Sequence, residues 1–284
     1  MEDQERPIEK VDIAGENVHW DLREDMSYAG YLQLEKLLSV QVPRTDKHDE
    51  AMFLMVHQVS ELWIKLALHE VGAAMDLIRK DTLEPAFKML TRVSHVQEQL
   101  KCVWDVISTM TPADYVAFRD ALGHASGFQS YQYRILEFRL GNKNAELIEV
   151  HRHEPEVFAE VKGALQAPSI YDEALRLLGR RGFDVPEERL ERDWSEPYRS
   201  HPAVEQAWLR VYRQSEKYWD LYELAEKLVD VEDHFHQWRF RHMKTVERII
   251  GFKRGTGGTS GVGFLRKALD LRFFPELWSV RTSL

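Results

Sequence analysis

Apolar residues along much of this chain recur at steps of three and four, the spacing that places side chains on one face of an α-helix. The clearest case is the segment 50–79, where Glu61 and Lys65 also form a favourable i,i+4 pair. We therefore predict a long amphipathic helix over 50–79, with Asp49 as its N-terminal cap. The stripe on its apolar face consists of Phe53, Val56, Ser60, Ile64, Ala67 and Val71.

Glycine and proline mark the ends of several further helices. Thr111 and Pro112 suit the start of a short helix that Gly123 ends, and Gly141 ends the next one. Strand-like alternation of apolar and polar residues is scarce, so the chain is predicted to be all-α, a bundle of long helices. The expected helices cover 85–108, 112–122, 128–140, 155–166 and 169–180, followed by an irregular segment over 182–202.

Residues 203–250 contain neither glycine nor proline. A single helix of this length would extend ~72 Å, which exceeds one domain. We therefore expect two collinear helices or a long antiparallel pair in this region. No change of composition marks a second domain.

Six of the 15 glycines lie within residues 251–264. The phosphate-binding pattern G-x-x-x-x-G-K-[ST] is absent, and G-x-G-x-x-G is matched only imperfectly, without a strand–loop–helix context. We expect a mobile loop that closes over an anionic group, for which Thr256, Thr259 and Ser260 offer donors. A plain flexible linker is the alternative.

The composition excludes several classes of protein. The net charge of −9, from 38 basic and 47 acidic residues, argues against nucleic acid as a partner. Cys102 is the only cysteine, which excludes a disulfide framework and the C-x-x-C-H haem attachment, and favours a cytoplasmic location. The acidic N-terminus has no apolar run behind it, and no stretch reaches the ~18 apolar residues of a membrane helix, so we expect no membrane partner.

The 12 histidines do not form an obvious metal motif. His234 and His236 are two positions apart and point in different directions on a helix, which favours solvated or interfacial roles. A di-iron bundle needs two Glu-x-x-His helices, and the chain does not supply them. H-E-x-x-H is also absent.

Single histidines on apolar helical faces are more informative. His242 shares a stripe with neighbours at steps of three and four, and His57 lies one turn after Phe53. On this pattern alone, a histidine of this kind is more often a core residue than a ligand. A noncovalent haem, however, needs one imidazole on its proximal side, and a second could act on the distal side. The stripe around His242 consists of Phe235, Trp238, Thr245 and Ile249.

Tyr115 and Arg119 stand four residues apart and share a helical face. An aromatic ring beside a guanidinium suits an amino-acid ligand, because the fork of the guanidinium matches a carboxylate. The alternative is a surface charge cluster of Arg119 with Asp114 or Asp120.

Five longer segments resemble one family, tryptophan 2,3-dioxygenase of the bacterial type. The resemblance covers about residues 28–282, and the residues before it lie outside. The segments are YAGYLQLEKLLS (28–39), HDEAMFLMVHQVSELWIKL (48–66), FRDALGHASGFQSYQYRILEFRLGNKN (118–144), DVEDHFHQWRFRHMKTVERIIGFKRGTGGTSGVGFL (230–265) and FFPELWSVRT (273–282).

The resemblance implies a role for each matching position. His242 would be the proximal ligand of the haem iron, and His57 the distal, catalytic histidine that hydrogen-bonds the indole N–H. Arg119 would pair with the substrate carboxylate, and Thr256 would meet the amino-acid end when the loop closes. Phe53 and Tyr115 would also contact the substrate. Tyr28 and Tyr31 would do so from a segment that reaches into the site of a neighbouring subunit. Positions that would line the haem are Trp104, Ser126 and Gly127.

The resemblance also implies the reaction and the oligomeric state. L-Tryptophan and O₂ would give N-formyl-L-kynurenine at one ferrous haem b per subunit of a homotetramer, a dimer of dimers. Residues 28–284 would form a single all-α haem dioxygenase domain with a lid loop over 251–264, after a partly disordered extension over 1–27. Because the indole N–H is a very weak acid, we favour orientation of the indole by His57 over its deprotonation. A haem-based sensor and a haem-free interaction module are the alternatives.

Overall fold

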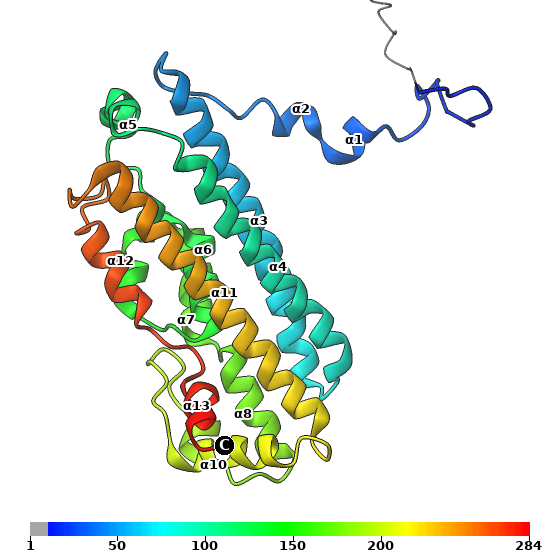
Figure 1. Cartoon of the computed structure of the whole chain (residues 1–284), viewed down its shortest axis with the longest axis vertical. Helices are drawn as coiled ribbons and strands as arrows, with labels where there is room; N and C mark the ends of the chain where they lie inside the picture. The colour runs from blue at the N-terminus through cyan, green and yellow to red at the C-terminus, as the bar shows by residue number, and fades with distance from the viewer. Residues whose placement is uncertain (1–10) are drawn as a thin grey trace, which may run out of the picture. The chain divides into compact units, whose positions relative to one another are not determined.

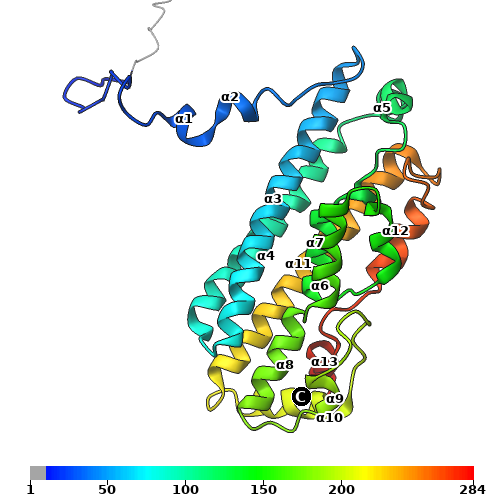
Figure 2. The ribbon, with the colours of Figure 1, turned by 180° about the vertical axis from the view of Figure 1, so that it is seen from behind.

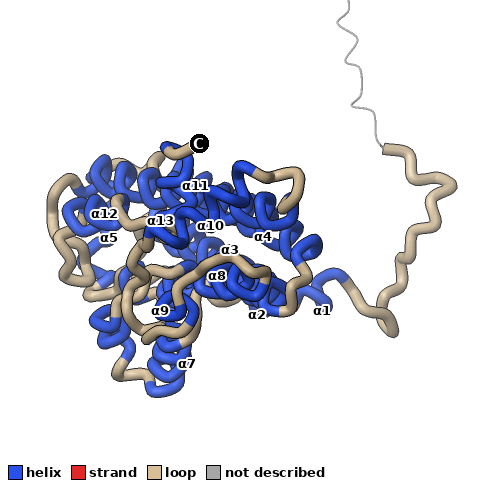
Figure 3. The backbone as a smooth tube through the Cα atoms, turned by 90° about the horizontal axis from the view of Figure 1, so that it is seen from below, coloured by secondary structure: helices blue, strands red, loops and turns tan. Residues whose placement is uncertain are grey.

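The computed structural model describes residues 11–284, which contain helices and loops and no strand (Figure 3). The prediction of an all-α chain is confirmed. The chain divides into two compact units, a short one that ends at Val42 and a large one over Pro43–Leu284. This division follows Val42, whereas the sequence suggested one after residue 27. The expected disorder of 1–27 lies partly outside the described residues, since these begin at 11.

The short unit contains two short helices, α1 (Tyr28–Leu32) and α2 (Leu34–Leu37). Ser27 caps α1, because its Oγ accepts a hydrogen bond from the amide of Gly30. Gln33 separates the helices with a left-handed backbone at φ 51°. The aromatic side chains of α1 are therefore carried on a short element outside the large unit's core.

Three long helices form the frame of the large unit (Figure 1). They are α3 (His48–Arg79), α4 (Leu83–Ile107) and α11 (Trp219–Ile250), and α4 packs along both of the others. The predicted helices over 50–79 and 85–108 are confirmed. Asp49 is not the cap of α3, because it lies inside the first turn and Lys47 occupies the cap position.

Residues 203–250 form two helices, as predicted, but the helices are not collinear. The chain turns between α10 (Pro202–Arg213) and α11, and α10 lies across the foot of the bundle (Figure 1). Trp208 of α10 is fully buried, and its Nε1 donates to the hydroxyl of Tyr171 at 3.1 Å. Burial of this side chain requires α10 to fold back onto the core.

Shorter helices cover the rest of the frame; α6, α7 and α8 lie together in the reverse view (Figure 2). Thr111 caps α5 through a reciprocal capping box with Asp114, and Gly123 ends the turn that follows at φ 57°. Gly141 ends α6 at φ 122°. These helices are α5 (Pro112–Arg119), α6 (Tyr131–Leu140), α7 (Pro155–Gln166), α8 (Ile170–Arg180), α9 (Glu187–Leu190), α12 (Val262–Leu269) and α13 (Pro275–Ser279), with 3₁₀ turns at Asp120–Leu122, Gly127–Gln129, Ala145–His151 and Val280–Thr282.

Helix α3 is, among residues 11–284, the one helix long and apolar enough to cross a membrane by length and composition. It packs against α4, α6 and α8, and 11% of its most apolar 18-residue window is buried in the single chain. Its other face carries apolar side chains that are 43–50% exposed in the single chain, namely Met55, Val59 and Leu62.

A small second core lies where α5 meets the start of α3 and the ends of α4 and α11. Its buried members are joined by partly buried neighbours that include Phe53 and Trp104. This cluster brings together segments that are far apart in the sequence, and the predicted site residues lie around it. The buried members are Ile107, Met110, Tyr115, Phe118 and Ile249.

Candidate functional site

The two histidines singled out by the sequence meet at a tryptophan of the helix between them. The ring of Trp104, on α4, stacks on the imidazole of His242 with centroids 4.2 Å apart and planes 6° from parallel. The same indole presents an edge-on contact to His57 of α3, at 6.3 Å. Three long helices therefore each place one ring in the same small volume.

His57 is fixed in one tautomer by its own helix. Its Nδ1–H donates to the carbonyl oxygen of Phe53, one turn earlier, at 2.7 Å. Because a carbonyl only accepts, Nδ1 carries the proton and Nε2 keeps its lone pair. Burial lowers the pKa of His57, partly opposed by the Phe53 hydrogen bond, so the ring is neutral near pH 7.

His242 is held neutral over a wider range. Burial, with a smaller contribution from His57, lowers its pKa to about 3. The side chains of its stripe are all buried, which confirms the predicted apolar face of α11. A neutral imidazole in such a wall offers a lone pair suited to a metal.

An aromatic wall adjoins His57. The Phe53 ring lies 4.2 Å from His57, 5.9 Å from Tyr115 and 5.5 Å from Phe118, measured between centroids. Burial raises the pKa of Tyr115, and the nearby guanidinium of Arg119 opposes that rise, so its hydroxyl stays protonated. Phe118 was not predicted, although its position one residue before Arg119 in PADYVAFRD places it on the same helix.

Arg119 turns toward the glycine loop rather than toward its acidic neighbours. Its Nη2 donates to the carbonyl oxygen of Arg254 at 2.9 Å, while its Nε is buried without a hydrogen-bond partner. Within the described residues it forms no ion pair with Asp114 or Asp120, and Asp114 bonds Thr111 instead. The alternative of a surface charge cluster is therefore wrong.

The glycine loop runs from Gly251 to Gly261, because α12 begins at Val262 and includes Gly263. It is shorter than the predicted 251–264. Thr256 lies at its tip, and its Oγ1 donates to the carbonyl oxygen of Ala125 at 2.6 Å. The loop thus contacts the turn that contains Ser126 and Gly127.

The remaining predicted residues are placed as follows. Ser126 caps the 3₁₀ turn that starts at Gly127, and its Oγ accepts from the amide of Phe128 at 3.3 Å. Tyr28 and Tyr31 lie on α1 in the short unit and are 75% and 74% exposed. The turn at Ser126 and Gly127 therefore lies against the glycine loop, whereas the two tyrosines belong to the short unit.

Several buried polar atoms on α4 and α11 lack hydrogen-bond partners. They include Nε1 of Trp104, Nε1 of Trp238 and Oγ1 of Thr245. An unpaired buried donor is costly, so a ligand that accepts from it is favoured. Trp104 is the one that also touches both histidines.

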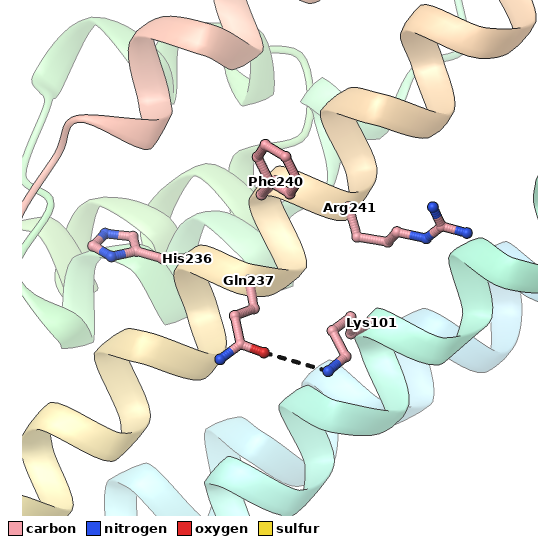
Figure 4. Close-up of a pocket in the computed structure, with 5 residues that line it drawn as sticks. All are labelled: Lys101, His236, Gln237, Phe240 and Arg241. Atoms are coloured by element: carbon pink, nitrogen blue, oxygen red, sulfur yellow. Dashed lines mark hydrogen bonds between the residues drawn. The ribbon is translucent and has the colours of Figure 1, made fainter.

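A surface pocket of about 390 Å³ lies on another face of α11 (Figure 4). Lys101 donates to Gln237 across it at 3.3 Å, and Arg241 pairs with Asp105 at 2.5 Å. His236 bonds the carbonyl oxygen of Leu271, which makes it an interfacial residue, as expected. These partnered side chains are separate from the two-histidine site.

The chain is similar to known proteins over nearly its whole length. Residues 14–284 match the family described as tryptophan 2,3-dioxygenase. A protein of that name from Bordetella pertussis is 58% identical over 272 residues, covering 96% of this chain and 96% of the relative. Relatives from Burkholderia cenocepacia and Polaromonas sp. are also 58% identical, over 94% and 96% of this chain and 86% and 92% of their own lengths.

The match starts at residue 14, so it includes part of the segment that the resemblance had left outside. Its length and identity confirm the resemblance seen in the five motifs. The chain belongs to the tryptophan 2,3-dioxygenase family, the haem-dependent oxidoreductases of tryptophan catabolism.

Proposed function

We propose that the site around Trp104 carries the family's reaction, in which both atoms of O₂ enter L-tryptophan and the indole C2–C3 bond opens to give N-formyl-L-kynurenine. The observation that carries this assignment is the meeting of His57 and His242 on Trp104, beside an aromatic wall that ends at Arg119. Helical spacing alone allowed each residue to be plain core. Their convergence from α3, α4, α5 and α11 supports a shared site.

The residues present fit a noncovalent haem b, one per subunit. His242 is neutral and would hold the iron, and the unpaired Nε1 of Trp104 is a donor for a carboxylate of the haem. The turn at Ser126 and Gly127 is proposed to line the haem edge. When bound in the ferrous form, the haem supplies the site where O₂ is activated.

The chain's own side chains bind and orient the substrate. Phe53, Tyr115 and Phe118 form an apolar wall for the indole and exclude water. The free Nε2 of His57 accepts the indole N–H, which orients the ring without removing its proton. Arg119 offers Nε to the carboxylate, and Thr256 lies at the tip of the loop that covers the amino-acid end.

We also propose a homotetramer, a dimer of dimers, in the cytoplasm. The exposed apolar face of α3, at Met55, Val59 and Leu62, supports contact with another copy of the chain. Tyr28 and Tyr31, exposed on a separate short unit, are suited to reach the site of a neighbouring subunit.

One preparation tests the proposal. Purified protein is examined for a haem absorption band, reduced, and assayed with L-tryptophan and O₂ for N-formylkynurenine. His242→Ala is expected to lose haem and turnover together, whereas Phe240→Ala, a control on an exposed face of α11, is expected to keep both. Normal haem content and turnover in His242→Ala would refute the ligand assignment. A haem band without product would favour the sensor, and no band would favour the interaction module.

A further inference from the structure

The tip of the glycine loop approaches the turn before α6 more closely than a side chain permits. A Cβ atom placed on Gly257 would lie 2.7 Å from Cβ and 2.9 Å from Oγ of Ser126. Nonbonded carbons attract at about 3.5–4.0 Å and repel strongly below that range. Position 257 can therefore lie on this turn only as glycine, and the reason is space rather than a left-handed backbone.

Two hydrogen bonds made by residues just before Gly257 depend on this close approach. Thr256, the preceding residue, bonds the carbonyl oxygen of Ala125, and Arg254 offers its carbonyl oxygen to Arg119. The same guanidinium keeps its Nε buried and unpaired. A guanidinium carries five N–H donors, so the loop can hold Arg119 while Nε remains for a carboxylate.

Both ends of the loop are anchored to α11. Gly251 ends α11 directly, and α12 is attached through Arg239, whose Nη1 donates to the carbonyl oxygen of Ala268 at 3.0 Å. Phe264 of α12 also contacts Phe128 edge-on at 5.7 Å. Because the ends are fixed, the position of the middle of the loop is decided by its contacts with the 125–127 turn and with Arg119.

We propose that Gly257 is a positioning residue for the reaction. Its missing side chain seats the loop on residues 125–127, which places Thr256 and holds Arg119 with Nε available for the substrate carboxylate. The identity of the substrate rests on the proposed function, whereas the packing of the loop on residues 125–127 rests on the contacts of Gly257. A methyl group at this position lifts the loop from the turn and breaks both hydrogen bonds.

Gly257→Ala tests whether the loop packs on residues 125–127 through this glycine, and Gly255→Ala is the matched control. A Cβ on Gly255 would meet only Oγ1 of Thr259, at 3.2 Å, and a hydroxyl can rotate away. The first measurement is the rate at which trypsin cuts the holoenzyme after the exposed Lys253 and Arg254, followed by fragment mass. Two hydrogen bonds of ordinary strength predict about thirtyfold faster cleavage in Gly257→Ala, and we expect less than about twofold change in Gly255→Ala.

The second measurement separates positioning from general damage. In Gly257→Ala the KM for L-tryptophan is expected to rise about tenfold, with kcat within about twofold and an unchanged haem absorption band. Ser126→Gly added to Gly257→Ala removes both atoms that the methyl group strikes. Because Ser126→Gly also removes the cap of the 3₁₀ turn, the single Ser126→Gly variant is the reference, and cleavage and KM of the double variant should return to its values. Failure of this rescue contradicts the steric argument.

Wild-type cleavage and wild-type KM in Gly257→Ala would overturn the proposal. The proposed function fails separately, if the wild-type holoenzyme makes no N-formylkynurenine. The trypsin comparison does not depend on turnover, so the two failures are distinguishable.

Discussion

Arg119→Leu separates recognition of the substrate carboxylate from every other role of this residue. The wild-type guanidinium lies beside the hydroxyl of Tyr115, its Nη2 holds the loop through Arg254, and its Nε is buried without a partner. Loss of the loop contact affects L-tryptophan and tryptamine alike, because both lie under the same loop. Loss of the carboxylate contact affects L-tryptophan alone, because tryptamine has no carboxylate.

The selective effect can be worked from that difference. A hydrogen bond to a charged group contributes about 1.5–3 kcal/mol, which corresponds to about 10- to 150-fold. The ratio of kcat/KM for L-tryptophan over tryptamine should fall by this factor in Arg119→Leu, while the common loss from the loop cancels. Steady-state rates at equal haem content measure it, with Val116→Ala, an exposed position on the same helix, as control. An equal fall for both substrates would refute the carboxylate role.

Three other variants test neighbouring parts of the site. His57→Ala should keep turnover at about a tenth of the wild-type rate, because it loses an orienting hydrogen bond; complete loss would identify His57 as an obligate base. Since burial lowers the pKa of His57 below its ordinary 6.5, any loss of kcat/KM through protonation of this ring should begin below pH 6.5 rather than at it. Thr256→Ala should reduce the preference for L- over D-tryptophan several-fold, about the value of one hydrogen bond, and an unchanged preference in competition assays counts against its contact. Phe118→Ala, at a position only 1% exposed, should lower the free energy of unfolding by about 3–5 kcal/mol in urea titration. A loss below about 1 kcal/mol would show that the small second core collapses into the space left by the ring.

Local patterns were sufficient to locate most helices. The capping box of Thr111 with Asp114 is formed by residues three apart, and Gly123 and Gly141 end helices where the sequence indicated. These features act within one or two turns, so they are readable from the sequence alone. The errors occurred where a distant contact decided the outcome.

The direction of α10 is one such error, because one of the two expected arrangements placed it collinear with α11. Nothing between 203 and 250 interrupts a helix locally, yet α10 folds back because Trp208 is buried and bonded to Tyr171 of α8. The end of the glycine loop is another, since Gly263 is drawn into α12 as that helix packs on α11. Helix propensity does not contain such long-range terms.

By itself the sequence determined the all-α class, the apolar faces that carry His57 and His242, and the shared face of Tyr115 and Arg119. Each of these follows from the 3.6-residue period of a helix, which is a local property. Only the tertiary structure decided that Trp104 joins the two histidines, and that Arg119 pairs with the loop rather than with Asp114 or Asp120. Hydrogen-bond partners and close contacts depend on how separate helices pack. The local pattern of residues does not tell how far one helix lies from another.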